Sequence, residues 1–241
     1  MINILIPACG SNQHFKDGYW PKNVTEISGK PMIEYTVDNF DSIPDKRFVY
    51  LLKREECTRF HTDDMLRIFT NGSAVTIQLE EETGGALCTG LMAITYIDNE
   101  DELFVSNHDQ TFDCDMELIR EDFQNRGADC GVVTFDCVHP RWSYIRMEND
   151  NVVETAEKRP ISKHAIAGLY YFKKGSFFVE SAKRTIRKGK AYNGKYYLSA
   201  AVNEMILMNK KVLNYEVQST EYHTFYSPQQ VEVYERGIRE G

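Results

Sequence analysis

The first half of the chain alternates short apolar runs with stretches of helical spacing. The apolar runs are typical of buried β-strands and cover residues 3–7, 47–52, 74–79 and 102–106. Apolar residues at helical spacing occur in two sets, one of Leu87, Leu91 and Ile94 and one of Met116, Ile119 and Phe123. Each set offers one apolar stripe to a sheet. The pattern predicts βαβ units and a parallel sheet with helices on both faces.

The pattern of apolar and polar residues changes beyond about residue 127. Short strand-like runs follow closely at 130–136, 144–148, 152–157 and 165–172, which predicts a mixed or antiparallel region. Helical spacing returns at 176–187, 198–208 and 228–238, with a strand at 212–217 between the last two helices. Because no Gly/Ser linker, low-complexity tract or repeat interrupts the chain, we expect one domain with two subregions, 1–127 and 128–241.

Composition narrows the class of protein. With 241 residues, 42% of them hydrophobic, the chain can bury a substantial core. A net charge of −8 argues against a nucleic-acid binder, which needs clustered Lys and Arg. The six cysteines include no C-x-x-C pair, so neither a zinc site nor a disulfide framework is indicated. The apolar run at the amino terminus follows no basic stretch and is far shorter than the ~20 residues of a membrane span, so we expect a cytoplasmic protein. Self-association into a homo-oligomer is left open.

The opening strand stops abruptly and is followed by a polar loop. This loop carries Gly10, Ser11 and Asn12 and ends in Pro21 and Lys22. Small residues let backbone N–H groups approach phosphate oxygens, and a lysine supplies positive charge. In open α/β sheets, ligands bind beyond the carboxyl ends of the strands. The loop therefore indicates a site for an anionic ligand, and we expect a nucleotide.

The chain resembles a known family along essentially its whole length. The resemblance begins with the strand, the Gly-containing loop, Pro-Lys and then "SGKPMIEYTVDNF", and it continues through "ETGGALCTG", "LFVSNHDQTFDCD", "WSYIRM", "VVETAEKRPISKHAIAGLYYF" and "NGKYYLSAAVNEMI". This order of motifs is similar to the sugar-phosphate nucleotidyltransferase branch of the GT-A superfamily, including members from capsule and lipopolysaccharide biosynthesis clusters. The resemblance implies a GT-A-like three-layer α/β/α fold with a mostly parallel central sheet.

The family binds a nucleoside triphosphate over its first half and joins it to a phosphorylated acceptor through one Mg²⁺. By resemblance Asp109 is the metal-binding aspartate, and a hard carboxylate oxygen suits that ion. Asp113 and Asp115 form a competing DxD pattern, but they precede a helix, where an N-cap and a first-turn acid are expected. The nucleotide-binding residues implied are Ala8, Cys9, Gly10, Ser11, Asn12, Glu81, Gly84, Gly85, Asn107 and Asp109. Gly84 and Gly85 would pass close to the nucleobase. Glu81 either binds the base edge or is a solvated charge in an acidic run.

The second half carries the implied acceptor site. Glu157 and Lys158 resemble an acid that binds acceptor hydroxyls and a lysine that contacts the acceptor phosphate. Gly168 resembles the glycine that lets the acceptor lie against a strand, and Tyr144 lies in the facing segment. Tyr197 is a further candidate, although an aromatic pair such as Tyr196 and Tyr197 is also typical of a core.

The chain departs from the family pattern at two positions. His14 stands where the family loop usually has an arginine for the β- and γ-phosphates, and a histidine is mostly neutral at pH 7 unless phosphates raise its pKa. His14 is a pH-sensitive substitute, a bystander, or a sign of a different leaving group. Many relatives place a second metal-binding aspartate near the carboxyl end. Asn203 is the nearest polar candidate here, with a solvent-facing helix residue as the alternative.

Three functions remain in view. The first is a Mg²⁺-dependent nucleotidyltransferase with Lys22, Asp109 and His14 in its catalytic centre, which joins a nucleoside triphosphate to a phosphorylated sugar or polyol-type acceptor and releases pyrophosphate. Its product would be a nucleotide-activated precursor for surface polysaccharide. The second is a glycosyltransferase of the same fold that uses a nucleotide sugar. The third is a catalytically silent nucleotide-binding relative, since both the arginine and the second acid are replaced.

Overall fold

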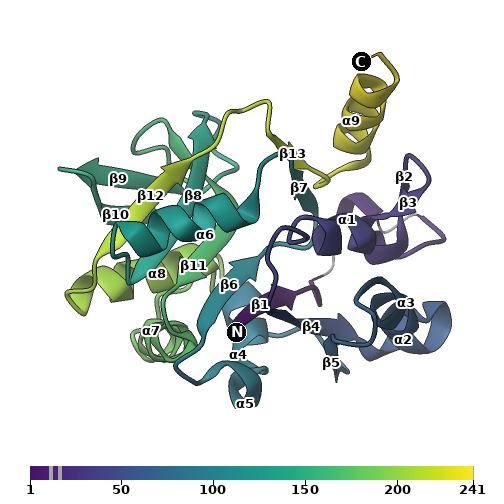
Figure 1. The fold of residues 1–241 in the computed structure, drawn as a ribbon, viewed down its shortest axis with the longest axis horizontal. Helices are drawn as coiled ribbons and strands as arrows, with labels where there is room; N and C mark the ends of the chain where they lie inside the picture. Colours follow the sequence, from purple (N-terminus) through teal and green to yellow (C-terminus); the bar gives the residue numbers. More distant parts are fainter. Residues whose placement is uncertain (11–12, 16–17, 241) are drawn as a thin grey trace.

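The computed structural model describes residues 1–10, 13–15 and 18–240. Within them, nine strands form one twisted sheet that runs through the molecule (Figure 1). Its order is β5 (Val75–Leu79), β4 (Lys46–Lys53), β1 (Ile2–Pro7), β6 (Glu102–Ser106), β11 (His164–Phe172), β8 (Cys130–Asp136), β12 (Val212–Glu216), β10 (Asn151–Ala156) and β9 (Tyr144–Glu148).

The two halves of the chain share this sheet. The first four strands of the order are parallel to one another, and β11 pairs antiparallel with both β6 and β8. β8 and β12 are again parallel, while β10 pairs antiparallel with β12 and β9. The mixed region expected beyond residue 127 is therefore a continuation of the first sheet. The β9–β10 hairpin closes through Asn149 and Asp150, whose φ values of 45° and 68° suit a two-residue turn.

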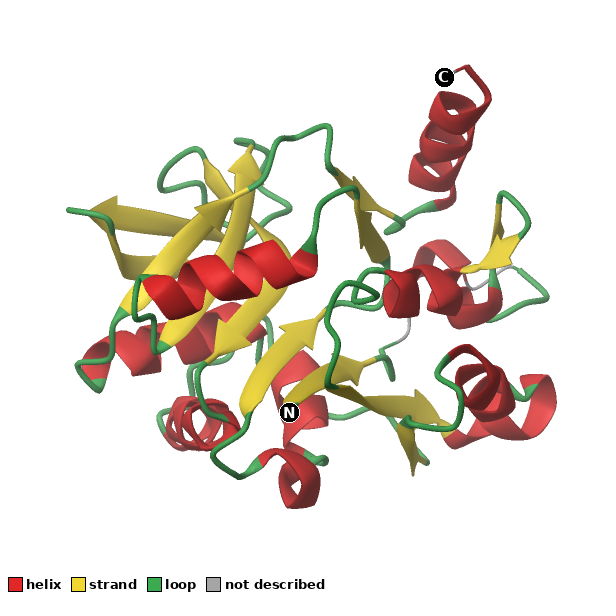
Figure 2. Cartoon of the chain, in the orientation of Figure 1, coloured by secondary structure: helices red, strands yellow, loops and turns green. Residues whose placement is uncertain are grey.

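Helices cover both faces of the sheet, as Figure 2 shows. Side chains alternate along β1, so Ile4 and Ile6 enter one core cluster and Leu5 enters the other. The first cluster packs under α1 (Met32–Asp38), α2 (Arg54–Phe60), α3 (Thr62–Phe69) and α6 (Met116–Asn125). The second packs under α4 (Ala86–Leu91), α5 (Ile94–Ile97), α7 (Gly175–Arg187) and α8 (Leu198–Leu207). This three-layer α/β/α arrangement confirms the expected fold class.

The C-terminal helix α9 (Pro228–Glu240) projects from the main body and carries the chain end (Figure 1). Its Val231 and the preceding Phe225 pack on α1 through Met32 and Tyr35, together with Ile27. Ile27 belongs to a short hairpin of β2 (Glu26–Ile27) and β3 (Lys30–Pro31). The last segment of the chain therefore docks beside the loop that follows β1.

Most predicted elements are found within one or two residues of their expected bounds. The stripe of Met116, Ile119 and Phe123 is fully buried on α6. The stripe at 87–94 is split, because the helix stops at Leu91 and a new turn begins at Ile94. Neither α2, α3 nor the small sheet of β7 (Gln110–Phe112) and β13 (Tyr222–Thr224) was expected.

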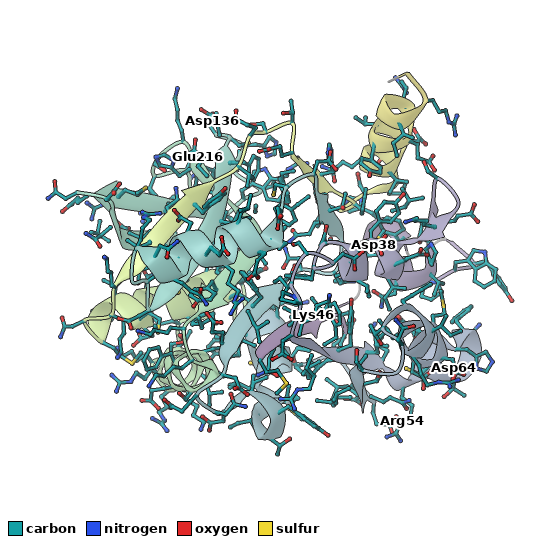
Figure 3. The ribbon with its side chains drawn as sticks, viewed as in Figure 1. Asp38, Lys46, Arg54, Asp64, Asp136 and Glu216 are labelled. Atoms are coloured by element: carbon teal, nitrogen blue, oxygen red, sulfur yellow. The ribbon has the colours of Figure 1, made fainter. Side chains whose placement is uncertain are left out.

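Charged side chains of both signs lie around the outside of the molecule. Figure 3 labels Asp136 and Glu216 near the ends of β8 and β12, and Arg54 and Asp64 on α2 and α3 at the opposite side of the view; all four residues are exposed. In the part of the chain that the structure describes, no helix is both long and apolar enough to cross a membrane.

Candidate active site

Lys22 and Asp109 lie against each other beyond the carboxyl ends of β1 and β6. Lys22 opens the short helix η2 (Lys22–Val24), and Asp109 lies in the loop between β6 and β7. Their side chains form an ion pair in which the lysine is 9% and the aspartate 15% exposed. Burial alone would raise the pKa of the Asp109 carboxyl, but the Lys22 ammonium, with His108 and a backbone hydrogen bond, outweighs burial and lowers it. The sequence prediction that these two residues share one site is consistent with this geometry.

A second contact runs beside this ion pair. The buried Asn23 side chain lies 2.7 Å from His108 Nδ1 through Oδ1, and its amide nitrogen donates to Glu56 Oε2 at 2.7 Å. Burial, reinforced by the Lys22 charge, lowers the pKa of His108 to about 4, so the ring is neutral near pH 7. Sequence reasoning missed Asn23 and Glu56, although Asn23 directly follows the predicted lysine.

Aromatic rings surround the Lys22 ammonium. Its Nζ lies 5.6 Å from the ring centre of Phe15 and 5.8 Å from that of Tyr226. The exposed His14 packs edge-on against Tyr226 with 5.1 Å between ring centres. His14 therefore contacts the same Tyr226 ring as Lys22, the candidate catalytic lysine. Ser11 and Asn12, the other predicted phosphate contacts of this loop, lie outside the described residues.

A pocket of about 200 Å³ opens beside the end of β1. It is lined by Pro7, Cys9, Gly10, Glu82, Thr83, Gly85, Ala86, Thr89, Lys195 and Tyr197. The pocket thus lies between the opening loop and the "ETGGA" segment, the two segments for which nucleotide contacts were predicted. Ala8, another predicted nucleotide contact, is buried and is not part of this lining. The acidic residue in the pocket lining is Glu82, which pairs with Lys53 at 3.1 Å and Lys195 at 3.9 Å. The predicted Glu81 is exposed and is not part of the lining.

The second glycine of this segment has a structural reason in addition to the expected one. Gly85 has φ +124°, and a Cβ there would lie 2.5 Å from the backbone oxygen of Tyr196. The Tyr196 N–H also donates to Gly84 O at 2.7 Å. A Cβ at Gly84 would meet only Cys88 and Tyr196 side-chain atoms, at 3.3 Å or more. One close approach at Gly85 is therefore made by the chain itself, and since Gly85 also lines the pocket, its contact with a nucleobase stays a prediction.

Glu157 and Lys158 lie in the turn after β10 and are held by different groups. Ser199 Oγ donates to Glu157 Oε2 at 2.7 Å, and the Ser143 hydroxyl donates to the same oxygen. Lys158, with φ +51°, donates to the Tyr197 hydroxyl at 3.3 Å. Since Tyr197 also lines the 200 Å³ pocket, the predicted acceptor residues lie next to the predicted nucleotide site. Ser143 and Ser199 were not predicted.

Two predicted acceptor contacts do not face this site. Tyr144 is fully buried in the core, and its hydroxyl donates to His139 O at 2.6 Å, so it cannot serve as the predicted substrate contact in this structure. Gly168 has φ +65°, and a Cβ there would lie 2.1 Å from Asn107 Nδ2. The predicted nucleotide contact Asn107 therefore fills the space in which the acceptor was expected.

Asn203 does not fit the role of a metal ligand. Its Oδ1 accepts from Thr155 N at 2.8 Å, and its Nδ2 donates to Thr155 O at 2.9 Å. Both ends of the amide thus bind the backbone of β10 and attach α8 to the sheet. The two aspartates of the competing DxD pattern both make structural contacts. Asp115 caps α6 by accepting from Glu117 N at 2.8 Å, and Asp113 pairs with His223 at 2.7 Å.

The remaining candidate for a divalent cation is Asp109. Among the described residues, no three His, Cys, Asp or Glu side chains gather in a way that could hold a metal ion. Mg²⁺ commonly takes one or two carboxylates and completes its octahedral shell with waters and substrate phosphates. A single deprotonated carboxylate beside the loop predicted to bind phosphate fits an ion that arrives with a triphosphate.

Comparison with known proteins agrees with this geometry. A model of the Nucleotidyl transferase family matches residues 19–217. The bifunctional protein GlmU of Caldicellulosiruptor saccharolyticus is 25% identical over 249 residues, which cover 95% of this chain and 51% of that protein. The chain thus spans about half the length of this curated relative.

Solved structures share the fold at low sequence identity. The nucleoside-diphosphate-sugar pyrophosphorylase from Vibrio cholerae RC9 superimposes with a TM-score of 0.80 at 22% identity, covering 97% of this chain and 99% of that chain. The inositol-1-phosphate CTP transferase from T. maritima gives a TM-score of 0.78 at 12% identity, covering 100% and 96%.

Proposed function

Because the chain belongs to the nucleotidyl transferase family, we propose that it transfers a nucleotidyl group from a nucleoside triphosphate to a phosphorylated sugar or polyol, with release of pyrophosphate. The observation that carries this proposal is the buried ion pair of Lys22 and Asp109 at the carboxyl ends of β1 and β6. It provides an ammonium and a carboxylate where a triphosphate would enter.

The reaction needs positioning and charge neutralisation more than acid–base chemistry. An oxygen of the acceptor phosphate attacks the α-phosphorus, and the bond from that phosphorus to the oxygen bridging to the β-phosphate breaks. The electron pair leaves with pyrophosphate. Lys22 contributes positive charge beside the phosphates, and His14 lies on the Tyr226 ring next to it. A Mg²⁺ held by Asp109 and the triphosphate would neutralise further negative charge.

The acceptor side uses the turn after β10. Glu157 is held by two serine hydroxyls through Oε2, and within the described residues its Oε1 receives no hydrogen bond. This oxygen can accept from acceptor hydroxyls, while the exposed Lys158 can meet the acceptor phosphate. In this proposal residues 1–127 bind the nucleotide and 128–241 the acceptor. The product would supply surface polysaccharide synthesis in the cytoplasm.

A substrate panel tests the proposal. The protein is incubated with Mg²⁺, each nucleoside triphosphate and a set of sugar and polyol phosphates, and pyrophosphate is measured with and without EDTA. We expect acceptor-dependent pyrophosphate release that EDTA abolishes. Release of nucleoside diphosphate from nucleotide sugars would instead support a glycosyltransferase, and nucleotide binding without turnover across the panel would support a silent relative.

A further inference from the structure

Two neighbouring contacts bridge the same pair of segments. Lys22 binds Asp109, and the next residue of one segment, Asn23, binds the preceding residue of the other, His108. Such a double contact between consecutive residues restricts both sliding and rotation of one segment against the other. A lysine side chain alone, with its four flexible carbons, would not impose this restriction.

Asn23 is fixed more firmly than a surface asparagine. It is 2% exposed, and its Nδ2 donates to Glu56 Oε2 at 2.7 Å, with Ala8 O at 3.4 Å. Because a carboxylate at Nδ2 sets which way the amide faces, Oδ1 turns to His108 and accepts from its Nδ1–H. The chain of contacts thus starts on α2, crosses the loop after β1 and ends in the loop after β6.

At the other end of this series of contacts, the backbone oxygens of His108 and Asp109 are held by hydrogen bonds. Thr36 Oγ1 on α1 donates to His108 O at 3.0 Å, and Phe225 N donates to Asp109 O at 2.7 Å. The 108–109 peptide segment is therefore held on its own, and Asn23 ties the loop carrying Lys22 to it, beside the Lys22–Asp109 ion pair.

We propose that Asn23 is a positioning residue for the transfer step, holding the Lys22 ammonium in register with Asp109 through His108, with Glu56 orienting the Asn23 amide. The inference rests on the proposed function. A displacement of about 1 Å can cost a reaction about 100-fold in rate, so loss of this contact should lower kcat while the triphosphate still binds.

The first test compares Asn23→Leu with the matched control Asn214→Leu. Asn214 is also buried and accepts a side-chain hydrogen bond, from Thr134 Oγ1 at 2.8 Å, but it lies on β12. We expect Asn23→Leu to lower kcat by roughly 10- to 100-fold and to change the KM for triphosphate by less than about threefold. Asn214→Leu should lose stability without this loss of kcat. Equal kcat losses in the two variants at equal Tm would overturn the proposal.

A double-mutant cycle then isolates the contact with His108. Because Asn23→Leu and His108→Leu each remove the same hydrogen bond, the double variant should lose little more kcat than either single variant. His108→Asn, whose amide nitrogen can replace Nδ1 as the donor, should restore most of the rate. Additive losses, or no recovery in His108→Asn, would contradict the role of this contact.

Lysine acylation followed by peptide mass spectrometry gives a readout that does not depend on turnover. In the wild type, Lys22 should react slowly, because its ammonium is buried and paired. In Asn23→Leu it should react several times faster, and in Asn214→Leu it should not. If acylation follows this pattern but the wild type releases no pyrophosphate, the proposed function fails and the positioning of Lys22 remains. If acylation is the same in all three proteins, the positioning itself is refuted.

Discussion

The predicted site contains two sets of one lysine and one acid, Lys22 with Asp109 and Lys158 with Glu157, and these two pairs of residues are arranged in opposite ways. The first pair is buried, and its two charges neutralise each other. In the second, Glu157 is held by serine hydroxyls, while the exposed Lys158 ammonium lies 5.2 Å and 5.8 Å from the ring centres of Tyr197 and Tyr192.

This difference indicates two kinds of ligand. In a buried, mutually neutralised pair each charge offsets part of the cost of burying the other, but the pair must exchange partners when a metal and a triphosphate bind together. A carboxylate held by neutral hydroxyls beside a separate ammonium leaves both charges available for a ligand with hydroxyls and one phosphate. On the proposed function, we therefore expect the highly charged substrate at the first pair and the acceptor at the second.

Lys22→Met should have the largest effect, because it removes the ammonium beside the phosphates and leaves Asp109 unpaired. We expect kcat to fall by roughly 100- to 1000-fold, as for the loss of one preorganised electrostatic group. Steady-state pyrophosphate release measures it, with circular dichroism as a check on folding. A wild-type rate would remove the lysine from the mechanism and with it the contrast between the pairs.

Lys158→Met should act on the acceptor and not on the nucleotide. A hydrogen bond to a charged group contributes about 1.5–3 kcal/mol, so the acceptor KM should rise by roughly 10- to 100-fold. The KM for triphosphate should change little. A rise in the triphosphate KM with an unchanged acceptor KM would reverse the assignment of the two pairs.

Gly85→Ala tests the contact between the predicted nucleotide and acceptor sides of the site, where the turn at Gly85 packs on Tyr196 next to Tyr197. The alanine meets both a positive φ and a backbone oxygen, so the free energy of unfolding should fall by about 3 kcal/mol. Gly84→Ala, the matched control, should cost less than about 1 kcal/mol. Urea denaturation measures both. Similar costs at the two positions would show that the Tyr196 contact does not constrain this turn.

The sequence predicted the layers better than the contacts between them. Apolar periodicity is a local signal, so strands such as β6, β8 and β9 were found at their observed bounds. The three-residue strands β7 and β13 form by pairing with each other across more than a hundred residues, and no local pattern announces them.

The site shows the same limit. Lys22 and Asp109 could be predicted because each follows a strand in a recognisable motif, yet Tyr226 reaches Lys22 only through the docking of the C-terminal segment. The predictions of Asn203 as a metal ligand and Tyr144 as a substrate contact were wrong, because the residue type alone does not tell whether a side chain binds a ligand or the backbone of its own protein. The actual partners of Glu157 are serines, whose short side chains give no signal outside the fold.

The smallest predicted effect concerns Glu102, which joins the two halves of the sheet. This β6 carboxylate accepts from Tyr171 on β11 and from Gln124 and Arg120 on α6. Burial would raise its pKa, but these hydrogen bonds and the Arg120 charge together lower it below the ordinary value of 4.5. Its contribution to stability is therefore complete above about pH 4.5 and is lost as the pH falls through the lower, folded-state pKa.

Glu102→Gln should thus lower the free energy of unfolding by roughly 1 kcal/mol at pH 7, after allowance for solvent screening. The gap between variant and wild type should narrow as the pH falls below that range, because the wild-type carboxyl then becomes neutral as well. Urea denaturation between pH 3 and pH 7 measures the gap. A gap that stays constant over this interval would mean that the shape of the Glu102 side chain, and not its charge, joins the two halves of the sheet. The importance of charge that we infer for the two active-site pairs would then not extend to the sheet that carries them.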